Sequence, residues 1–461
     1  MTTMNLPRFM LSAPKSGSGK TTLTCGILRA LEQDRHKVAA FKSGPDYIDP
    51  MFHSKVVGTK SRNLDLFLLG GGDKGAANAR WLLAENSRDV SLSVLEGAMG
   101  FYDGIGVTTE ASAYDLAKAT GTPVVIELDA KGAALSLAAQ LRGFKDFRPD
   151  SNIQGFILNN ANAGTYSFYK RVLEEETGLK GLGFLPYLKN CNLSSRHLGL
   201  VTAEEIVNLE QLLELLAEVV KKTVDLDGIL KIAASAEPLT YEPLAVERLG
   251  KVRLAVAQDK AFCFYYQDVL DLFQKLGAEI VPFSPLQDKE VPASDGLYIG
   301  GGYPELYAPD LSANKSMLAS LKKNVLSGKP CYAECGGYMY LQEHFQNKEG
   351  CYDWVGALPG TVKMTGKLTR FGYIKLTARK DNLFCKAGET LTGHEFHYSE
   401  STVTGTDFHA VRANGQKEWD CVRAAADLFA GYPHLHLCGF PAAAANFVQA
   451  CLDYKQRMLN K

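Results

Sequence analysis

The segment at residues 8–22 combines an apolar run, a glycine-rich turn and a helical pattern. It reads RFMLSAPKSGSGKTT. A strand, a glycine loop, Gly-Lys-Thr and a helix, in that order, are typical of a phosphate-binding loop, whose backbone N–H groups point at phosphate oxygens. Lys20 would reach the β- and γ-phosphates, and the Thr21 hydroxyl would bind Mg²⁺. The residues that we expect around the nucleotide are Ser16, Gly17, Ser18, Gly19, Lys20, Thr21 and Thr22.

The loop departs from the common G-x-x-x-x-G-K pattern at its start. The position of the first glycine holds Pro14, and Ala13 precedes it. This departure resembles the phosphate-binding loops of the dethiobiotin synthetase branch of P-loop proteins. Lys15 stands where partition-type ATPases carry an extra lysine. A solvated loop lysine is the simpler interpretation of Lys15.

Three carboxylates follow predicted strands close to this loop. Asp46 and Asp49 lie in FKSGPDYIDP, which we expect to be a loop, and Glu96 ends the apolar run of VLEGAMGFYDG. A carboxylate at a strand end beside a phosphate-binding loop suits a metal site, so we predict Mg²⁺ on Thr21, Asp46 and Glu96. A plain Asx-turn is the alternative for each aspartate. Asn159, at a later strand end, is expected to hydrogen-bond an adenine edge or to cap a helix.

A second set of reactive residues lies in the C-terminal half. The segment YAECGGYMYL carries Cys335 from an extended run into a helical one through Gly336 and Gly337. This is the pattern of a nucleophile elbow with cysteine in place of serine. Such a nucleophile needs a base, and GYPHLHLCGFP supplies His434 and His436, which strand alternation would place on one face. Glycines expected to line an oxyanion or amide site are Gly300, Gly301, Gly302 and Gly336.

The hydrophobic pattern predicts the scaffold for these segments. In the first half we expect strands at residues 9–13, 38–42, 92–96, 124–128 and 153–158, and helices at 20–33, 74–84, 111–119, 132–142, 165–176 and 203–222. Such apolar strands suit a doubly wound parallel sheet with ligands at the strands' carboxyl ends. A second alternation predicts strands at 252–257, 279–282 and 296–299 and helices at 262–276 and 311–326. We therefore expect an α/β protein with a P-loop domain at 1–235, a linker at 236–250 and a second α/β domain at 251–461.

Composition limits the classes of partner. The chain has 461 residues and a net charge of −1, without a basic run that would suit nucleic acid or a membrane surface. No apolar run has transmembrane length. The ten cysteines form no C-x-x-C pair, so neither a disulfide framework nor a zinc site is indicated. We expect a cytoplasmic protein with reduced thiols, as a monomer or homodimer.

In combination, these motifs resemble those of the cobyrinic acid a,c-diamide synthase family. The matching segments occur in one order along nearly the whole chain: SGSGKTT, GPDYIDP, RNLD, EGAMGFYDG, RHLGL, GGGYPEL, AECGGYMYL, GHEFHYS and HLH. The resemblance implies an ATP-dependent amidotransferase with a C-terminal class I glutamine amidotransferase domain. Its expected reaction, in cobalamin biosynthesis, amidates the a- and c-acetate carboxylates of a corrin, cobyrinate, with glutamine-derived ammonia through an acyl phosphate.

The resemblance also implies roles for single residues. Cys335 would take nitrogen from glutamine with His434 as its base. Class I amidotransferases usually carry Glu two residues after this His, where the present sequence has His436, so we expect a dyad rather than a triad. The GHEFHYS segment, with spacing H-E-x-H, is expected to be a substrate or interdomain loop rather than a zinc site. The residues expected to handle the tetrapyrrole polycarboxylate are Tyr47, Asp49, Asp103, Arg196 and His197.

Two alternatives compete with this interpretation. The first is the same chemistry on nickel-sirohydrochlorin or another tetrapyrrole, because that relative carries almost the same motifs. The second is a partition-type P-loop ATPase that moves or scaffolds other molecules. Lys15 alone supports it, and it gives Cys335 and His434 no role.

Overall fold

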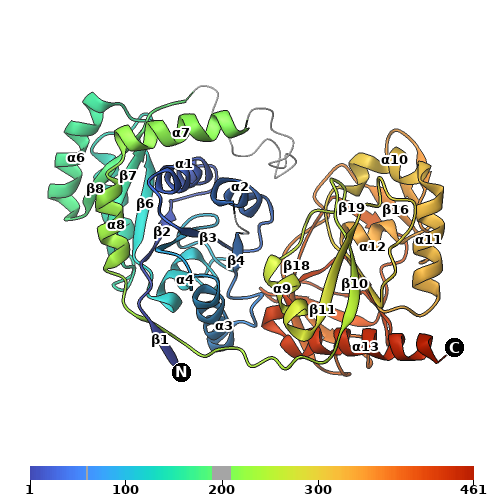
Figure 1. Cartoon of the computed structure of the whole chain (residues 1–461). Coiled ribbons are helices and arrows are strands. Elements are labelled where there is room, and N and C mark those ends of the chain that lie inside the picture. Colours follow the sequence, from blue (N-terminus) through green and yellow to red (C-terminus); the bar gives the residue numbers. More distant parts are fainter. Residues whose placement is uncertain (59–60, 189–208, 461) are drawn as a thin grey trace. The chain divides into compact units, whose positions relative to one another are not determined.

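The chain divides into two compact units (Figure 1). The structure is a computed structural model that describes residues 1–58, 61–188 and 209–460. Unit 1 comprises residues 1–66 and 71–244, and unit 2 comprises residues 67–70 and 245–461. The chain therefore contributes a short segment to unit 2 before unit 1 is complete.

Unit 1 is built on a sheet that is parallel throughout its described strands. Their spatial order is β4-β3-β5-β2-β6-β7-β8. The bounds are β2 (Arg8–Ser12), β3 (Val38–Ser43), β4 (Arg62–Leu64), β5 (Leu92–Glu96), β6 (Val124–Asp129), β7 (Ile153–Asn159) and β8 (Lys180–Leu185). Because β2 lies between β5 and β6, the loop after β2 emerges at the centre of the sheet's carboxyl edge, where doubly wound folds bind ligands.

Helices connect these strands. They are α1 (Lys20–Gln33), α2 (Ile48–Val57), α3 (Gly72–Glu85), α4 (Ala113–Thr120), α5 (Ser136–Asp146), α6 (Ala163–Thr177), α7 (Leu209–Thr223) and α8 (Leu226–Ala234). Two short strands, β1 (Thr2–Met4) and β9 (Leu239–Tyr241), pair antiparallel. Strand β9 lies inside the range 236–250 that the sequence predicts to be a linker, and its pairing ties the end of unit 1 to its beginning.

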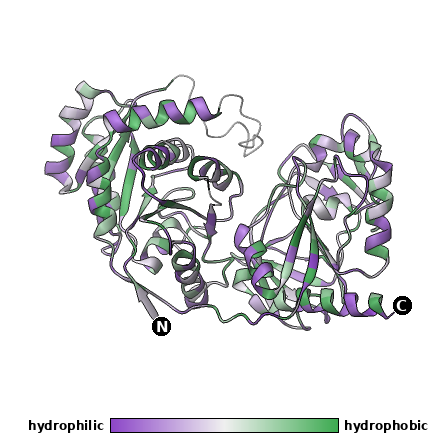
Figure 2. Cartoon of the chain, in the orientation of Figure 1, coloured by the Kyte–Doolittle hydropathy of each residue, from purple (hydrophilic) through white to green (hydrophobic). Residues whose placement is uncertain are grey.

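Helices α1 and α7 pack against each other over the core of unit 1 (Figure 1). Leu209, Leu213, Leu216 and Val220 follow the spacing that puts side chains on one helix face, and all are buried. Gly26 of α1 permits the close approach, since a Cβ there would lie 2.8 Å from Val220 Cγ2. Figure 2 shows that hydrophobic residues lie along the strands and that polar residues lie on the outer faces of the helices.

Unit 2 contains a sheet of order β11-β10-β12-β13-β23-β22, parallel except for the β22–β23 pair. The bounds are β10 (Val252–Ala257), β11 (Ala278–Phe283), β12 (Gly296–Ile299), β13 (Cys331–Glu334), β22 (Arg423–Ala425) and β23 (Leu428–Gly431). The helical elements are α9 (Gln267–Leu276), η1 (Pro304–Tyr307), α10 (Ala308–Ala313), α11 (Lys315–Leu326), α12 (Gly336–Tyr340), η2 (Leu437–Gly439) and α13 (Pro441–Leu459). Strand β13 is central, so the residue after it leaves the sheet at the middle of its carboxyl edge.

Two smaller sheets complete unit 2. One has the order β21-β20-β17-β18-β24 and is antiparallel, and the other has the order β15-β14-β16-β19. Their strands are β14 (His344–Gln346), β15 (Cys351–Asp353), β16 (Thr361–Met364), β17 (Arg370–Ala378), β18 (Thr390–His397), β19 (Ser399–Ser401), β20 (Phe408–Arg412), β21 (Glu418–Cys421) and β24 (His434–Leu435). Of these strands the sequence analysis anticipates only β24, through the strand alternation assumed for His434 and His436.

Several predicted boundaries are wrong for local reasons. The helix predicted at 262–276 begins only at Gln267, because Phe264 forms a bridge with Gly301 instead. The helix predicted at 311–326 is broken at Asn314, whose side chain accepts from Met317 N and caps α11. The segment FKSGPDYIDP is not wholly a loop, since α2 begins at Ile48. The helix predicted at 203–222 is described from Leu209 onward.

Within the described residues, every helix is too short or too polar to cross a membrane.

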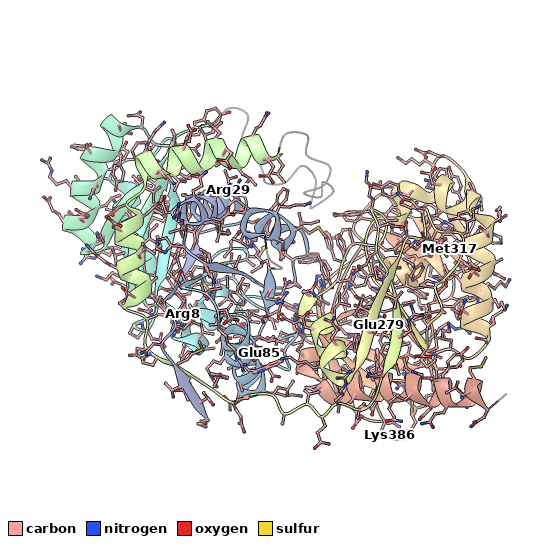
Figure 3. The ribbon with its side chains drawn as sticks, in the orientation of Figure 1. Arg8, Arg29, Glu85, Glu279, Met317 and Lys386 are labelled. Atoms are coloured by element: carbon pink, nitrogen blue, oxygen red, sulfur yellow. The ribbon has the colours of Figure 1, made fainter. Side chains whose placement is uncertain are left out.

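Arg8 is a buried charge at the start of β2 that holds three parts of unit 1 together (Figure 3). Its guanidinium donates to the carbonyl oxygens of Thr120 at 2.7 Å and Glu237 at 2.8 Å. It also donates to Leu6 O at 2.8 Å and Gly121 O at 3.2 Å. The carbonyls at the end of α4 and beyond α8 therefore depend on one side chain.

We expect Arg8→Met to lower the free energy of unfolding of unit 1 by at least about 2 kcal/mol, because buried carbonyls lose their donors. Chemical denaturation of the full chain measures this loss. Arg88→Met is the matched control, because the Arg88 side chain is 53% exposed and pairs only with Glu85 among the described contacts. Equal stability of the two variants would contradict the structural role of Arg8.

Candidate active sites

The phosphate-binding loop predicted in unit 1 joins the end of β2 to the start of α1. Gly17 and Gly19 have φ values of 72° and 110°, which a residue with a Cβ adopts only with strain. A Cβ on Gly19 would also lie 2.4 Å from Asn159 Nδ2. The loop conformation therefore requires glycine at this position.

Lys20 is buried at the first position of α1. Its ammonium donates to the carbonyl oxygens of Met99 at 2.7 Å and Lys15 at 3.0 Å. Burial, with the nearby Lys42 ammonium, lowers the pKa of Lys20. An anion such as a phosphate would relieve this cost, so the surroundings of Lys20 suit a phosphate ligand.

Glu96, fully buried at the end of β5, gathers the polar groups next to this loop. One carboxylate oxygen accepts from Thr21 Oγ1 and from Lys42 Nζ, both at 2.8 Å. The other lies 2.7 Å from Nε2 of His53 on α2. Burial alone would raise the pKa of Glu96, but Lys42 and His53 outweigh it and hold the pKa well below its usual range. Glu96 is therefore ionised.

Lys42 connects Glu96 to the two aspartates of the second segment. Its ammonium lies 2.5 Å from Asp49 Oδ2, and Asp49 is in the first turn of α2. Asp46 precedes the helix, where Oδ1 accepts from Ile48 N at 2.7 Å. Burial, together with the Asp49 carboxylate, raises the pKa of Asp46 to about 7. The Lys42 ammonium thus interacts electrostatically with the carboxylates of Asp46, Asp49 and Glu96.

The oxygen donors beside the loop fit Mg²⁺ by type. Mg²⁺ prefers one or two carboxylates with phosphate and water oxygens, and Thr21, Glu96 and Asp46 are of this kind. Within the described residues, no three His, Cys, Asp or Glu side chains are arranged to hold a metal by themselves. The three predicted ligands, Thr21, Asp46 and Glu96, therefore stay predictions.

Asn159 ends β7 as expected, but its side chain supports the loop. Its amide donates to Ser18 O at 2.6 Å and to Glu127 Oε1 at 2.8 Å. Burial raises the pKa of Glu127 to about 8, against the opposing effects of Lys20 and Asn159. The helix cap nearby is Asn162 and not Asn159. Contact of Asn159 with an adenine edge stays a prediction.

The residues predicted to handle substrate are less closely grouped. Tyr47 is buried directly before α2. Asp103 stabilises a turn, because its Oδ2 accepts from Gly100 N at 3.0 Å. Arg196 and His197 lie outside the described residues.

Cys335 in unit 2 follows β13 and precedes α12, and its backbone has φ 48° and ψ −106°. A non-glycine residue in this region is strained, as in nucleophile elbows. Gly337 makes the turn possible, since a Cβ there would lie 2.0 Å from Ile299 O. The side chain of Cys335 is 7% exposed.

His434, in β24, is the imidazole that the fold brings to Cys335. The Cys335 thiol hydrogen-bonds the His434 ring. Burial alone would lower the pKa of His434, but Cys335 and Glu334 outweigh it and raise this pKa to about 10. Nδ1 of His434 lies 3.6 Å from Glu334 Oε1.

His436 does not share this position. The strand ends at Leu435, so the alternation that would place both imidazoles on one face does not continue. The His436 ring stacks on Tyr266 at a centroid distance of 4.7 Å, and burial lowers its pKa to about 3. His436 is therefore a neutral core residue in this structure.

The glycine loop after β12 lies against the elbow and the imidazole. A Cβ on Gly301 would lie 2.6 Å from His434 Cε1, and one on Gly336 would lie 3.3 Å from Gly302 N. The Gly300 amide donates to the Tyr265 hydroxyl at 2.9 Å, so this amide already has a partner. An oxyanion role for Gly301, Gly302 and Gly336 stays a prediction.

The GHEFHYS segment is not a loop, which corrects the prediction. It forms most of β18, pairs with β17 and β24, and places His394 opposite His434. The two rings lie 6.2 Å apart between centroids, and burial lowers the pKa of His394 to about 3. Nε2 of His397 lies 3.8 Å from Glu395 Oε2. This strand forms a wall behind the imidazole of His434.

Sequence reasoning missed three residues that the structure places in these sites: Lys42, His53 and Glu334. Lys42 ends an apolar strand, where a charged residue is a signal. His53 lies three residues after FKSGPDYIDP, in α2, a helix that the sequence analysis does not predict. Glu334 directly precedes the nucleophile in the sequence, whereas class I amidotransferases usually carry their acidic residue two positions after the histidine.

Comparison with known proteins adds the following matches. Residues 253–442 match a family model described as a CobB/CobQ-like glutamine amidotransferase domain. Residues 9–201 match a CobQ/CobB/MinD/ParA nucleotide binding domain. A structure of PurLQS from Thermotoga maritima is similar over 44% of this chain and 99% of that chain, with 16% identity and a TM-score of 0.32, which is too low to bear on the fold.

Three similar full-length relatives bear the name cobyrinate a,c-diamide synthase. The one from Listeria monocytogenes serotype 4b is 41% identical over 437 residues, 93% of this chain and 96% of the relative. The one from Caldanaerobacter subterraneus is 37% identical over 454 residues, 97% and 99% of the two chains. The one from Thermoplasma volcanium is 37% identical over 460 residues, 98% and 99% of the two chains.

We expect Gly301→Ala to displace the His434 ring, because the new Cβ would lie 2.6 Å from Cε1. The Cys335 sulfur then loses its contact with His434, and its alkylation by iodoacetamide slows by about tenfold or more. Peptide mass spectrometry follows the Cys335 peptide over time. Gly350→Ala is the control, since a Cβ there would lie no closer than 3.9 Å to its nearest neighbour, the ring of Tyr352. Unchanged alkylation in Gly301→Ala would contradict the arrangement.

Proposed function

The chain belongs to the cobyrinate a,c-diamide synthase family, and we propose that it converts the a- and c-acetate carboxylates of cobyrinate to amides, with glutamine as nitrogen donor and ATP as activator. It is a glutamine-dependent amidating ligase of cobalamin biosynthesis. The family expected from the motifs, and the pairing of a P-loop domain with a glutamine amidotransferase domain, are thus confirmed. The observation that supports the mechanism best is the Cys335–His434 contact at a strained elbow.

The reaction in unit 2 would release ammonia from glutamine. The Cys335 thiolate attacks the side-chain amide carbon, and the His434 imidazolium donates a proton to the leaving nitrogen. A C–S bond forms and the C–N bond breaks, which leaves a γ-glutamyl thioester and ammonia. Water then hydrolyses the thioester to glutamate and restores the thiol. Gly301 and Gly302 would donate to the oxyanion that develops on the amide oxygen.

The reaction in unit 1 would activate the acceptor. A carboxylate is a poor acyl donor, so transfer of the γ-phosphoryl group of ATP to a carboxylate oxygen gives an acyl phosphate and ADP. Ammonia then attacks the acyl carbon, and phosphate leaves. The phosphate-binding loop and Lys20 would hold the nucleotide and offset the charge on the transferring phosphoryl group.

Mg²⁺ would be held by the Thr21 hydroxyl and the carboxylates of Asp46 and Glu96, and it would supply positive charge beside the phosphates. The donor chemistry supports this assignment, as does the raised pKa of Asp46, a buried carboxylate crowded by Asp49. Candidates for contact with the macrocycle are Tyr47, Asp49, Asp103, Arg196 and His197. Of these, Asp49 is already paired with Lys42.

The function is tested by supplying purified protein with ATP, Mg²⁺, glutamine and one macrocycle at a time. We expect cobyrinate to give the a,c-diamide, identified by mass spectrometry, and no product without ATP. Equal or faster amidation of nickel-sirohydrochlorin would move the assignment to that substrate. ATP hydrolysis without amidation of either macrocycle, and without glutamine hydrolysis, would instead support a partition-type ATPase.

Cys335→Ala should abolish amidation with glutamine, because the thioester cannot form, and should retain amidation with ammonium chloride. The loss of glutamine-dependent rate should be at least about a hundredfold. Cys331→Ala is the matched control on the same strand, because Cys331 is fully buried and burial raises its pKa to about 12. Glutamate release that persists unchanged in Cys335→Ala would overturn the nucleophile assignment.

A further inference from the structure

We propose that Glu334, the residue directly before the nucleophile, is the acidic positioning residue of the glutaminase centre. It would hold His434 through Nδ1 and so complete a triad whose acid comes from the nucleophile's own strand. The inference rests on the proposed function, and it replaces the dyad expected from sequence. Glu334 touches neither the substrate nor the sulfur and acts through the imidazole.

The fold explains how the consecutive residues Glu334 and Cys335 can both contact the imidazole of His434, on different sides of the ring. Glu334 is the last residue of β13 and is fully buried among β12, β13 and β23. Cys335 then turns out of the strand with a positive φ. The acid therefore stays beneath the imidazole, while the sulfur leaves the sheet with the elbow.

Three donors surround the side-chain oxygens of Glu334. One oxygen accepts from the Tyr298 hydroxyl at 3.0 Å. The other accepts from the Tyr332 hydroxyl, and from Leu435 N at 3.3 Å. A buried carboxylate without a cation costs free energy unless such donors satisfy it. All three donors are neutral, so they satisfy the oxygens without cancelling the charge.

His434 is the basic group that faces this charge. The distance of 3.6 Å from Nδ1 to Oε1 is an ion-pair distance and slightly longer than a hydrogen bond. Catalytic hydrogen bonds in ligand-free enzymes are often long and tighten when substrate binds. With Nδ1 toward Glu334, Nε2 is the nitrogen available to the thiol.

Other titratable neighbours do not supply this charge. His394, from β18, and His436 both have pKa values lowered to about 3 by burial, so they are neutral at physiological pH. Glu395 faces Arg370 at 3.7 Å and His397 at 3.8 Å. Tyr265, Tyr298 and Tyr332 have pKa values raised by burial and remain protonated. The acid that acts on His434 from the described residues around it is Glu334.

The chemical consequence concerns the proton on His434. A carboxylate at Nδ1 fixes the ring orientation and tautomer, and it stabilises the imidazolium that donates to the leaving nitrogen. Without that charge the pKa of His434 falls, so the imidazolium is lost at a lower pH. Because activity requires the imidazolium, the alkaline limb of the pH profile would move to lower pH.

Glu334→Gln in the full chain tests this role. We expect kcat for glutamine hydrolysis to fall by at least about tenfold with little change in KM, since the acid assists proton transfer and not glutamine binding. The alkaline limb of kcat/KM should move down by at least about one pH unit. Amidation with ammonium chloride should be unchanged, which shows that unit 1 is intact.

Two further variants separate positioning from packing. Glu334→Asp keeps the charge and should keep the alkaline limb near its wild-type position, even if kcat falls. Tyr332→Phe removes a hydroxyl donor but not the charge, and should lower kcat less than Glu334→Gln does. If Glu334→Gln does not fold, Glu334→Asp still tests the role, because an alkaline limb displaced in this variant, which keeps the charge, would contradict it.

The results discriminate the two levels of the proposal. If wild-type protein releases no glutamate, or does so without Cys335, the proposed function itself fails. If glutamate release depends on Cys335 but Glu334→Gln keeps the wild-type alkaline limb, the positioning role is wrong. A lowered denaturation temperature with an unmoved limb would make Glu334 a structural residue only.

Discussion

Both units depend on one constraint: the strand order of a parallel sheet determines which side chains lie next to one another at its carboxyl edge. Adjacent parallel strands end at the same edge, so residues far apart in the chain meet without any special loop. In unit 1, this edge brings the loop after β2 beside Glu96 at the end of β5 and Asn159 at the end of β7. In unit 2, it places Glu334 and Cys335 at the end of the central strand β13. Glu96, Asn159 and Glu334 are thus held at the ends of buried strands, beside the loop and helix residues that complete each site.

Burial gives these groups their chemical character. Glu96 stays ionised inside the protein because Lys42 and His53 surround it, whereas Glu127 and Asp46, with weaker compensation, have pKa values raised to about 8 and 7. The same contrast separates the histidines of unit 2. His434, beside Cys335 and Glu334, has its pKa raised to about 10, while the equally buried His436 has its pKa lowered to about 3. Charged neighbours, more than depth, distinguish reactive residues from core residues.

The local parts of this arrangement could be predicted from sequence, and the non-local parts could not. The phosphate-binding loop and the elbow are short segments whose glycines are required by their own backbone, so Lys20 and Cys335 were identified from the pattern alone. The role of Glu334 is not predictable locally, because it depends on His434, which β24 supplies from a different sheet. The GHEFHYS segment was read as a loop because its mixture of polar and aromatic residues hides a strand that is buried by long-range pairing with β17 and β24. His53 acts only because α2 returns it to the end of β5.

The segment at residues 67–70 has a consequence for how this chain can be divided. Although the segment lies among the elements of unit 1 in the sequence, it belongs to unit 2, where Phe67, Leu68 and Leu69 are buried and Thr392 donates to Phe67 O at 2.8 Å. A side chain on Gly439 would lie 2.4 Å from Leu68 O, so the surface that receives the segment is closely fitted. A gene cut once between the units would therefore yield a C-terminal fragment lacking part of its own interior. A fragment that starts at residue 245 would lack the four residues at 67–70, so unit 2 is complete only in a chain that also carries the early part of unit 1.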